Sequence, residues 1–223
     1  MIKNRMVLVL FSFSLMANQI EEPSKSDLSS MNWAMRDEFE LDERVLSLAV
    51  KAYKNARNKQ ITTSSILCII DYSRKSARPR FWVLDLAKHE VLFFEHVAHG
   101  ANSGDRSLAK RFSNDMSSKQ TSLGLFLTGP TYFGKNGYSL QLIGLENGVN
   151  DNAYKRRIVL HGANYVSREM ASQLGFVGRS FGCPSVSTAV SKPIIDTIKD
   201  GTLLFSYYPD ADWLNNSEFL KGS

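Results

Sequence analysis

The sequence predicts a mainly β domain, sandwich-like or barrel-like, with a few helices. Three observations carry this prediction. Short runs of Val, Ile, Leu, Phe and Tyr recur through residues 61–209, turn residues separate them at short intervals, and few stretches show the helical spacing of three and four. The chain has 223 residues, of which 43% are hydrophobic, so it can bury the core of one domain. Many short strands joined by turns are typical of β-sandwiches and barrels.

The first 17 residues have the pattern of an export signal. Lys3 and Arg5 precede an apolar run over residues 6–16, and Ala17 offers a small residue for cleavage. The run is too short to span a hydrocarbon core, which needs about 20 residues. We therefore expect residues 1–17 to be a signal peptide, with no integral membrane span after its cleavage and an exported protein as the result. A buried N-terminal helix or an uncleaved anchor is the alternative.

Residues 18–60 are predicted to form a linker followed by a helix. Polar side chains dominate residues 18–32, as in flexible linkers. From residue 33 to residue 58, apolar side chains recur at helical spacing, and most charges lie off that face. The helix is expected to pack on the main domain through its apolar face, which consists of Leu41, Val45, Leu48, Ala49, Ala52 and Ala56.

The main domain, residues 61–209, is predicted to consist mostly of strands. Two apolar runs flank a short polar turn at residues 87–90, which indicates a β-hairpin. Gly129 and Pro130 are expected to form another turn. Residues 100–122 are polar and Ser-rich, which indicates a long loop. The predicted strands are residues 65–71, 80–86, 90–95, 123–128, 138–143, 157–160 and 202–208.

A second helix is predicted near the C-terminus, over residues 188–200. Pro193 lies in its first turns and Gly201 comes just after its end, as is common at helix boundaries. After the last strand, residues 210–223 are expected to be a C-terminal tail.

The distribution of charge and the spacing of the histidines argue against nucleic-acid binding and metal catalysis. The formal net charge of +5 fits an anionic partner or, more simply, a solvated basic surface. No Lys/Arg block is dense enough to indicate a nucleic-acid groove. The histidines show no zinc-ligand spacing, with no cysteine pair and no His-Glu-x-x-His helix beside them, so no metal and no cofactor is expected. The four histidines are His89, His96, His99 and His161.

The two cysteines, Cys68 and Cys183, are expected to be free thiols. Cys68 lies inside an apolar strand, as is typical of a core cysteine. Cys183 lies in a turn-like segment. An even cysteine count in an exported chain also allows a disulfide. Pairing would, however, consume the thiol that is the better candidate for chemistry.

His161 and Cys183 form the candidate catalytic pair. His161 closes an apolar strand, and Cys183 lies in a turn rich in Ser, Gly and Pro before a helix. A free thiol has a pKa of about 8.5, so an imidazole that accepts its proton makes it a nucleophile for an amide carbonyl. The N–H groups of Phe181, Gly182 and Cys183 are candidates for an oxyanion hole. A histidine and a cysteine 22 residues apart also occur by chance, so a core histidine and a buried cysteine remain the alternative.

The sequence around this pair resembles the active-site motif of the L,D-transpeptidase (YkuD-type) family of cell-wall enzymes. His161-Gly162 is followed by Ser180-x-Gly182-Cys183 at about the distance found in that family. The resemblance covers about residues 45–209. Four further segments resemble the branch of murein L,D-transpeptidase catalytic-domain-like proteins, namely residues 97–100, 122–129, 144–152 and 203–207.

The resemblance implies a β-sandwich-like catalytic domain in the periplasm or cell envelope. It implies that Cys183 attacks the bond between diaminopimelate and the terminal D-Ala of a peptidoglycan stem, so that D-Ala leaves and a thioester forms. An amine on a neighbouring stem then makes a 3→3 cross-link. His161 would be the general base and acid, oriented by the carbonyl of Gly162. Peptidoglycan stem peptides would be the partners, and the residues implied to bind them are Ser180, Arg179, His99 and Ser122.

Two departures from the family's motif concern the second half of this reaction. Phe181 stands where a His is common, and Pro184-Ser185 follow the cysteine where an Arg or Asn is common. Water instead of an amine would then make the protein an L,D-carboxypeptidase or a related amide hydrolase. A non-catalytic envelope-binding protein is a third alternative, which the intact Cys183 and His161 disfavour.

Overall fold

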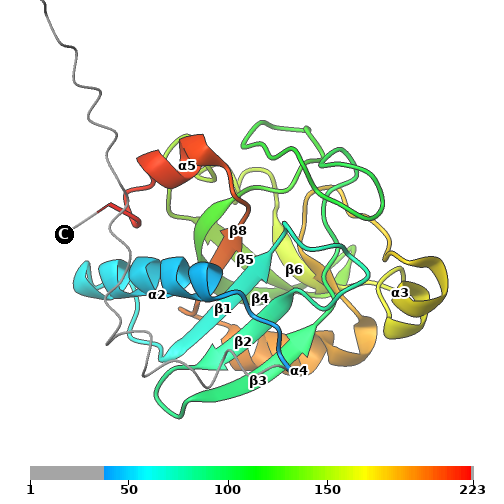
Figure 1. Cartoon of the computed structure of the whole chain (residues 1–223), viewed down its shortest axis with the longest axis horizontal. Coiled ribbons are helices and arrows are strands. Elements are labelled where there is room, and N and C mark those ends of the chain that lie inside the picture. The colour runs from blue at the N-terminus through cyan, green and yellow to red at the C-terminus, as the bar shows by residue number, and fades with distance from the viewer. Residues whose placement is uncertain (1–37, 222–223) are drawn as a thin grey trace, which may run out of the picture.

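A computed structural model of the chain describes residues 38–221, and eight strands within them form one sheet. The strand order is β3-β2-β1-β8-β4-β5-β6-β7, and the helices lie outside this sheet (Figure 1). The strands are β1 (Ile66–Asp71), β2 (Phe81–Asp85), β3 (Glu90–Glu95), β4 (Gly124–Gly134), β5 (Gly137–Gly144), β6 (Val159–Gly162), β7 (Ser185–Val186) and β8 (Leu203–Tyr207). The helices are α2 (Glu43–Asn58), α3 (Arg168–Leu174), α4 (Thr188–Ile198) and α5 (Ala211–Asn216).

The sheet closes almost completely on itself. β3 and β7 are its first and last strands, and the segment after β3 bridges to β7, where the N–H of Ala98 donates to the Ser185 carbonyl at 2.8 Å. Apolar side chains fill the interior, and the free thiol of Cys68 is fully buried among them. The mainly β prediction is therefore confirmed as a nearly closed eight-stranded barrel with few helices. Cys68 is the core residue that its strand predicts.

The N-terminal helix α2 packs on the outside of this barrel, as predicted. Its apolar face is buried in a second core that includes Leu67 of β1 and Phe205 of β8. The helix begins later than the predicted residue 33, because the Asp42 carboxylate accepts a hydrogen bond from the Val45 N–H at 3.1 Å and caps the first turn at Glu43. Leu41, which the prediction places on the apolar face of the helix, therefore lies before the helix but is buried in the same core.

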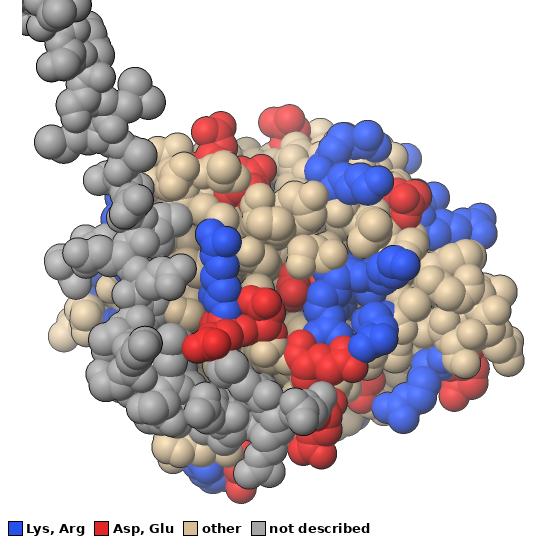
Figure 2. Space-filling view, in the orientation of Figure 1, with Lys and Arg blue, Asp and Glu red and all other residues tan. Residues whose placement is uncertain are grey.

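The expectations for the first 32 residues, a signal peptide at 1–17 and a linker at 18–32, lie outside the described residues. Within residues 38–221, no helix has both the length and the apolar character that a bilayer crossing requires. Lys and Arg side chains are interspersed with Asp and Glu over the face shown in Figure 2, as in a solvated basic surface.

Two local features differ from the sequence prediction. β4 does not turn at Gly129-Pro130 but continues to Gly134, with an irregular register at the glycine and proline. A proline can stay in a strand at such a bulge because the ladder does not need its missing N–H there. The short helix α3 starts after its cap residue Ser167 and is too brief for hydrophobic periodicity to reveal it.

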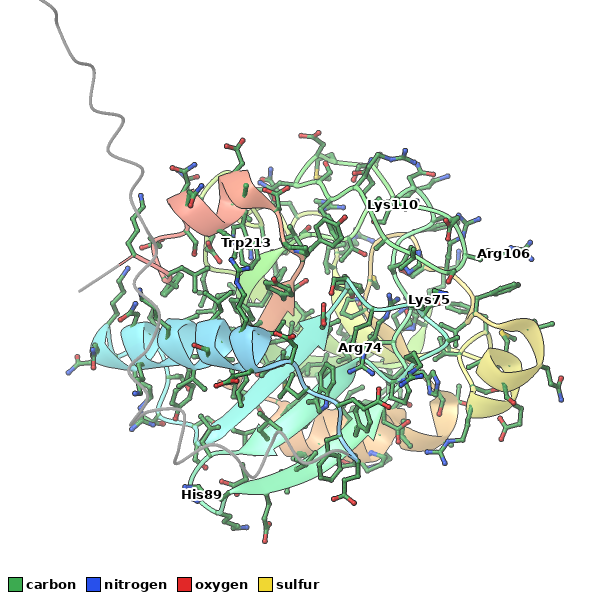
Figure 3. The ribbon with its side chains drawn as sticks, in the orientation of Figure 1. Arg74, Lys75, His89, Arg106, Lys110 and Trp213 are labelled. Carbon is green, nitrogen blue, oxygen red and sulfur yellow. The ribbon has the colours of Figure 1, made fainter. Side chains whose placement is uncertain are left out.

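The segment after β8 carries a helix that belongs to the core and is more than a tail. Trp213 of α5 is buried, and its ring lies 5.5 Å from that of Phe205 in β8, centroid to centroid. Its indole N–H donates to Glu146 Oε2 at 3.1 Å. Figure 3 shows Trp213 between α5 and the sheet. This contact ties the C-terminal segment to the loop between β5 and β6, and so supports the strand that carries the candidate site.

Candidate active site

The parallel pairing of β6 and β7 brings the two halves of the predicted site together. His161 of β6 is in register with Ser185 of β7, which follows Cys183 by two residues. Along a strand, alternate side chains share a face. Leu160 points into the barrel core, so Val159 and His161 lie on the opposite face of β6. The closure of the barrel thus places the base beside the segment that carries the nucleophile.

The imidazole of His161 is held at both nitrogens. Nδ1 lies 2.9 Å from the Gly162 carbonyl oxygen, the contact that the resemblance implies. A carbonyl can only accept, so Nδ1 carries the proton and Nε2 is left as the acceptor. Nε2 lies 2.9 Å from the Ser185 hydroxyl, which therefore donates to it. Burial lowers the pKa of His161, and the bond to Gly162 counters this, so the ring is neutral at rest.

Two residues that the sequence argument missed, Ser185 and Tyr165, complete this hydrogen-bonded chain. The Tyr165 hydroxyl lies 3.1 Å from Ser185 Oγ, whose own proton is donated to His161. Ser185 has 0% exposure, so it cannot itself meet a substrate and is not a nucleophile. No local sequence pattern marks Ser185, because only the pairing of β7 with β6 brings its hydroxyl to His161.

The turn that presents Cys183 is built by Ser180 and Gly182. The Ser180 hydroxyl donates to the Cys183 carbonyl at 2.6 Å and accepts from the Gly182 N–H at 3.0 Å. Gly182 has a φ of 118°, and a Cβ there would lie 2.8 Å from the Gln120 carbonyl oxygen. Only glycine fits both conditions. The Ser-x-Gly-Cys order is thus required by the backbone of this turn.

The thiol of Cys183 lies against the start of β6. Its Sγ is 3.7 Å from the Arg157 carbonyl oxygen. Burial raises the pKa of Cys183, while the N–H of Val159 and the positive charge of Arg156 counter that rise. In the described residues no hydrogen bond joins the thiol to His161, whose Nε2 is bonded to Ser185. The resting site therefore holds a neutral thiol and a neutral imidazole instead of an ion pair.

Arg156 is the cation that acts on this thiol, and no local sequence pattern marks it. Its guanidinium is half-buried and donates to the Gln120 carbonyl at 2.6 Å and to Ser118 Oγ at 3.0 Å. Arg156 therefore fixes the loop at 113–122 against Gly182 and also favours the ionised form of Cys183. This positive charge comes from the loop before β6.

The four residues expected to line the substrate cleft are engaged inside the fold. His99 is fully buried; Arg80 donates to its Nδ1 at 2.9 Å, and its Nε2–H donates to the Asp105 carbonyl at 2.8 Å. Burial lowers the pKa of His99 to about 4. Its ring is structural, and its main-chain carbonyl accepts from the Ser180 N–H at 2.9 Å.

The other three predicted contacts have comparable structural explanations. Arg179 donates to the carbonyls of Ala101 and Gly104 at 2.8 and 2.9 Å, which anchors the long loop. The Ser122 hydroxyl donates to the Ser113 carbonyl at 2.9 Å and accepts from Arg156. Ser180, as described above, uses its hydroxyl within the turn. These side chains hold the turn and the loops of the site together, and the expectation that they bind substrate stays a prediction.

The N–H groups predicted to form the oxyanion hole differ in whether they already have a hydrogen-bond partner. The Gly182 N–H is already donated to Ser180 Oγ, so it is not available to an oxyanion in this arrangement. The N–H groups of Phe181 and Cys183 have no hydrogen-bond partner among the described residues and remain candidates. Phe181 itself is 74% exposed beside the thiol.

The described residues hold no group of three or more His, Cys, Asp or Glu side chains that could bind a metal ion. His89 lies in the turn between β2 and β3, far from β6 in the view of Figure 3. The Nε2–H of His96 donates to the Ala77 carbonyl oxygen at 3.0 Å.

The site has a cysteine and a histidine oriented by a main-chain carbonyl on neighbouring segments of a nearly closed β barrel, an arrangement that suits cysteine-dependent acyl transfer. The profile of the L,D-transpeptidase catalytic domain family matches residues 37–207, and the chain belongs to this family. The resemblance seen in the sequence is thereby confirmed. The family consists of cysteine L,D-transpeptidases that act on peptidoglycan.

Solved structures that the chain resembles share little sequence with it. An L,D-transpeptidase from Mycobacterium smegmatis is 13% identical, with a TM-score of 0.40, over 65% of this chain and 59% of that one. An L,D-transpeptidase from Stackebrandtia nassauensis is 12% identical, with a TM-score of 0.37, over 83% and 80%. The helical cell shape determining protein Pgp2 from Campylobacter jejuni is 11% identical, with a TM-score of 0.42, over 72% and 57%. The chain thus spans about three fifths of the length of the mycobacterial protein. No curated protein matches the chain significantly.

Replacing Gly182 by Ala is expected to dismantle the nucleophile turn. The added Cβ would meet the Gln120 carbonyl, and alanine is strained at a φ of 118°. We expect the free energy of unfolding to fall by about 1–3 kcal/mol and the alkylation rate of Cys183 to change at least severalfold. Gly148→Ala is the matched control, because Gly148 has a φ of 75° with open space around its Cβ position. Equal effects in denaturant melts and alkylation assays would contradict the role given to the turn.

The resting protonation state predicts how Cys183 reacts with iodoacetamide. Because burial raises its pKa, its alkylation rate should climb with pH through a value above that of an ordinary thiol, without a plateau at acidic pH. Cys68 should stay unmodified in the native protein, since its thiol is fully buried. Peptide mapping by mass spectrometry after timed alkylation measures both rates. A plateau reached well below neutral pH would show a thiolate–imidazolium pair and would contradict the neutral resting site.

Proposed function

We propose that this protein is a peptidoglycan L,D-transpeptidase that forms 3→3 cross-links through a thioester on Cys183. The observation that carries the proposal is the combination of a thiol in a Ser-x-Gly-Cys turn with an imidazole oriented by Gly162, within a domain of this family. The donor is a tetrapeptide stem, and the leaving group is its terminal D-Ala. The proposed location is the periplasm or cell envelope, reached by export.

In the first half-reaction, Cys183 Sγ attacks the carbonyl carbon of the diaminopimelate–D-Ala bond, and the thiol proton passes to His161 Nε2. The oxyanion that forms is stabilised by the N–H groups of Phe181 and Cys183, which lack partners among the described residues. The C–N bond then breaks, and the imidazolium returns its proton to the amine of D-Ala. A thioester between Cys183 and the shortened stem remains.

In the second half-reaction, a side-chain amine of a neighbouring stem attacks the thioester. Its proton passes to His161, the C–S bond breaks, and the thiolate takes the proton back. The product is an amide between two diaminopimelate residues. Water as the attacking group gives a tripeptide instead, which is the carboxypeptidase outcome.

Ser185 must take part in the first proton transfer. Its hydroxyl occupies Nε2 in the resting site, 2.9 Å away. Either the hydroxyl yields Nε2 to the thiol when substrate binds, or it accepts the thiol proton while passing its own to Nε2. In both cases the bond to Ser185 keeps Nε2 unprotonated and ready to accept, and the bond to Gly162 keeps the proton on Nδ1.

The proposal is tested by product analysis with purified tetrapeptide stems and the protein. We expect cross-linked dimers with release of one D-Ala per bond formed, detected by mass spectrometry. Cys183→Ala should abolish this, because the nucleophile is gone, whereas Cys68→Ala should retain turnover if it folds. Tripeptide alone would assign the carboxypeptidase activity, and an unchanged substrate with folded protein would refute both.

A further inference from the structure

A surface cavity of about 430 Å³ lies directly beside the nucleophile. It is formed by the ends of β4 and β5, the residues before β6, and the face of β6 that also carries His161. Its lining consists of Tyr132, Gln141, Tyr154, Lys155, Arg157, Ile158 and Val159. None of these residues was singled out by the sequence, and none of their side chains has been assigned a part in the chemistry above.

Arg157 connects this cavity to the thiol. Its carbonyl oxygen lies 3.7 Å from Cys183 Sγ, while its side chain lines the cavity. Its φ of 56° is in the left-handed region, where a residue other than glycine is uncommon. The cavity therefore has in its lining a residue, Arg157, whose main chain contacts Cys183 Sγ.

The cavity is positively charged and its polar groups have no internal partners. Among the described residues, neither Lys155 nor Arg157 has a side-chain hydrogen bond or ion pair, and no Asp or Glu lines the cavity. The hydroxyls of Tyr132 and Tyr154 likewise donate to no described residue. By contrast, Arg156, which lies between these two cations in the sequence, donates its hydrogen bonds to Ser118 Oγ and the Gln120 carbonyl within the fold. Two cations and two phenol donors around one opening suit a carboxylate.

We propose that this cavity binds the free side-chain carboxylate of the diamino acid whose carbonyl Cys183 attacks, with Arg157 as the principal contact and Lys155 beside it. The proposal rests on the proposed function and deepens it, since it makes the protein specific for donor stems that carry this carboxylate over stems in which it is amidated. An amide loses the charge and presents a donor N–H₂ toward the two cations, which accept nothing. The hydrophobic stems of Tyr132 and Tyr154 enclose the aliphatic part of the same side chain.

The test compares two tetrapeptide donors that differ only in this group, free carboxylate against carboxamide, with the full-length protein. A charge-assisted hydrogen bond predicts a preference of about tenfold or more in kcat/KM for the free acid, expressed mainly in KM. Arg157→Gln should reduce the preference to about twofold or less, and Arg157→Lys should retain part of it because the charge remains. The matched control is Lys135→Gln, which changes an exposed lysine in the β4–β5 turn outside the cavity and should leave the preference unchanged.

Binding to Cys183→Ala, measured by calorimetry with the same two donors, separates this proposal from the proposed function. If Cys183→Ala binds the free acid about tenfold more tightly than the amide, the cavity assignment stands even where no turnover is seen. Equal affinity for the two donors, or a preference that survives in Arg157→Gln with native circular dichroism, would overturn it. No product from either donor, with discrimination in binding intact, would count against the transpeptidase alone.

Discussion

The pairing of β6 with β7 is the interaction on which the site depends. These are the last two strands of the sheet, and their parallel register sets His161 opposite Ser185. A slip by one residue would turn His161 into the barrel and bring Leu160 out, because side chains alternate along a strand. The bridge from Ala98 to Ser185 closes the barrel against β7 and prevents that slip. The contacts that close the barrel are thus the same contacts that bring the two halves of the site together.

In the site assembled in this way, the thiol of Cys183 and the imidazole of His161 are both neutral at rest. Burial raises the pKa of Cys183 and lowers the pKa of His161, so both shifts oppose an ion pair before substrate arrives. Both side chains nevertheless have contacts that suit the roles proposed for them. Gly162 fixes the tautomer of the ring, and Arg156 supplies positive charge where negative charge develops on sulfur. Because a thiol oxidises less readily than a thiolate, the neutral form protects Cys183 from oxidation at rest. The nucleophilic thiolate forms only as the proton is transferred.

Much of this architecture could be predicted from the sequence, for identifiable reasons. Apolar runs fixed the positions of the strands, and the apolar face of α2 is buried as its spacing requires. The motif located Cys183 and His161, because a glycine turn and a strand end are local features. The contacts of His99 and Ser122 could not be predicted, since their partners Arg80 and Arg156 are brought to them only by the tertiary fold.

The cavity beside Cys183 escaped prediction for the same reason. Arg157 is a single basic residue in the sequence, and only its backbone conformation and its contact with Cys183 give it significance. The attachment of the C-terminal segment could not be predicted either, because its helix is too short to show periodicity. Its buried side chains pack on elements distant in sequence, and they are Trp213, Leu214, Phe219 and Leu220. Local sequence patterns predict helices and strands, whereas a site formed by residues distant in sequence is visible only in the tertiary structure.

The central claim, that Cys183 carries the acyl group and His161 delivers it, is tested most directly by trapping the intermediate. The protein is mixed with a tetrapeptide donor in the absence of an acceptor amine, quenched in acid and digested for mass spectrometry. The account predicts an adduct equal to the donor minus D-Ala on the peptide that contains Cys183, formed far more slowly in His161→Ala. An adduct on Cys68, or an adduct formed at an unchanged rate without His161, would contradict it.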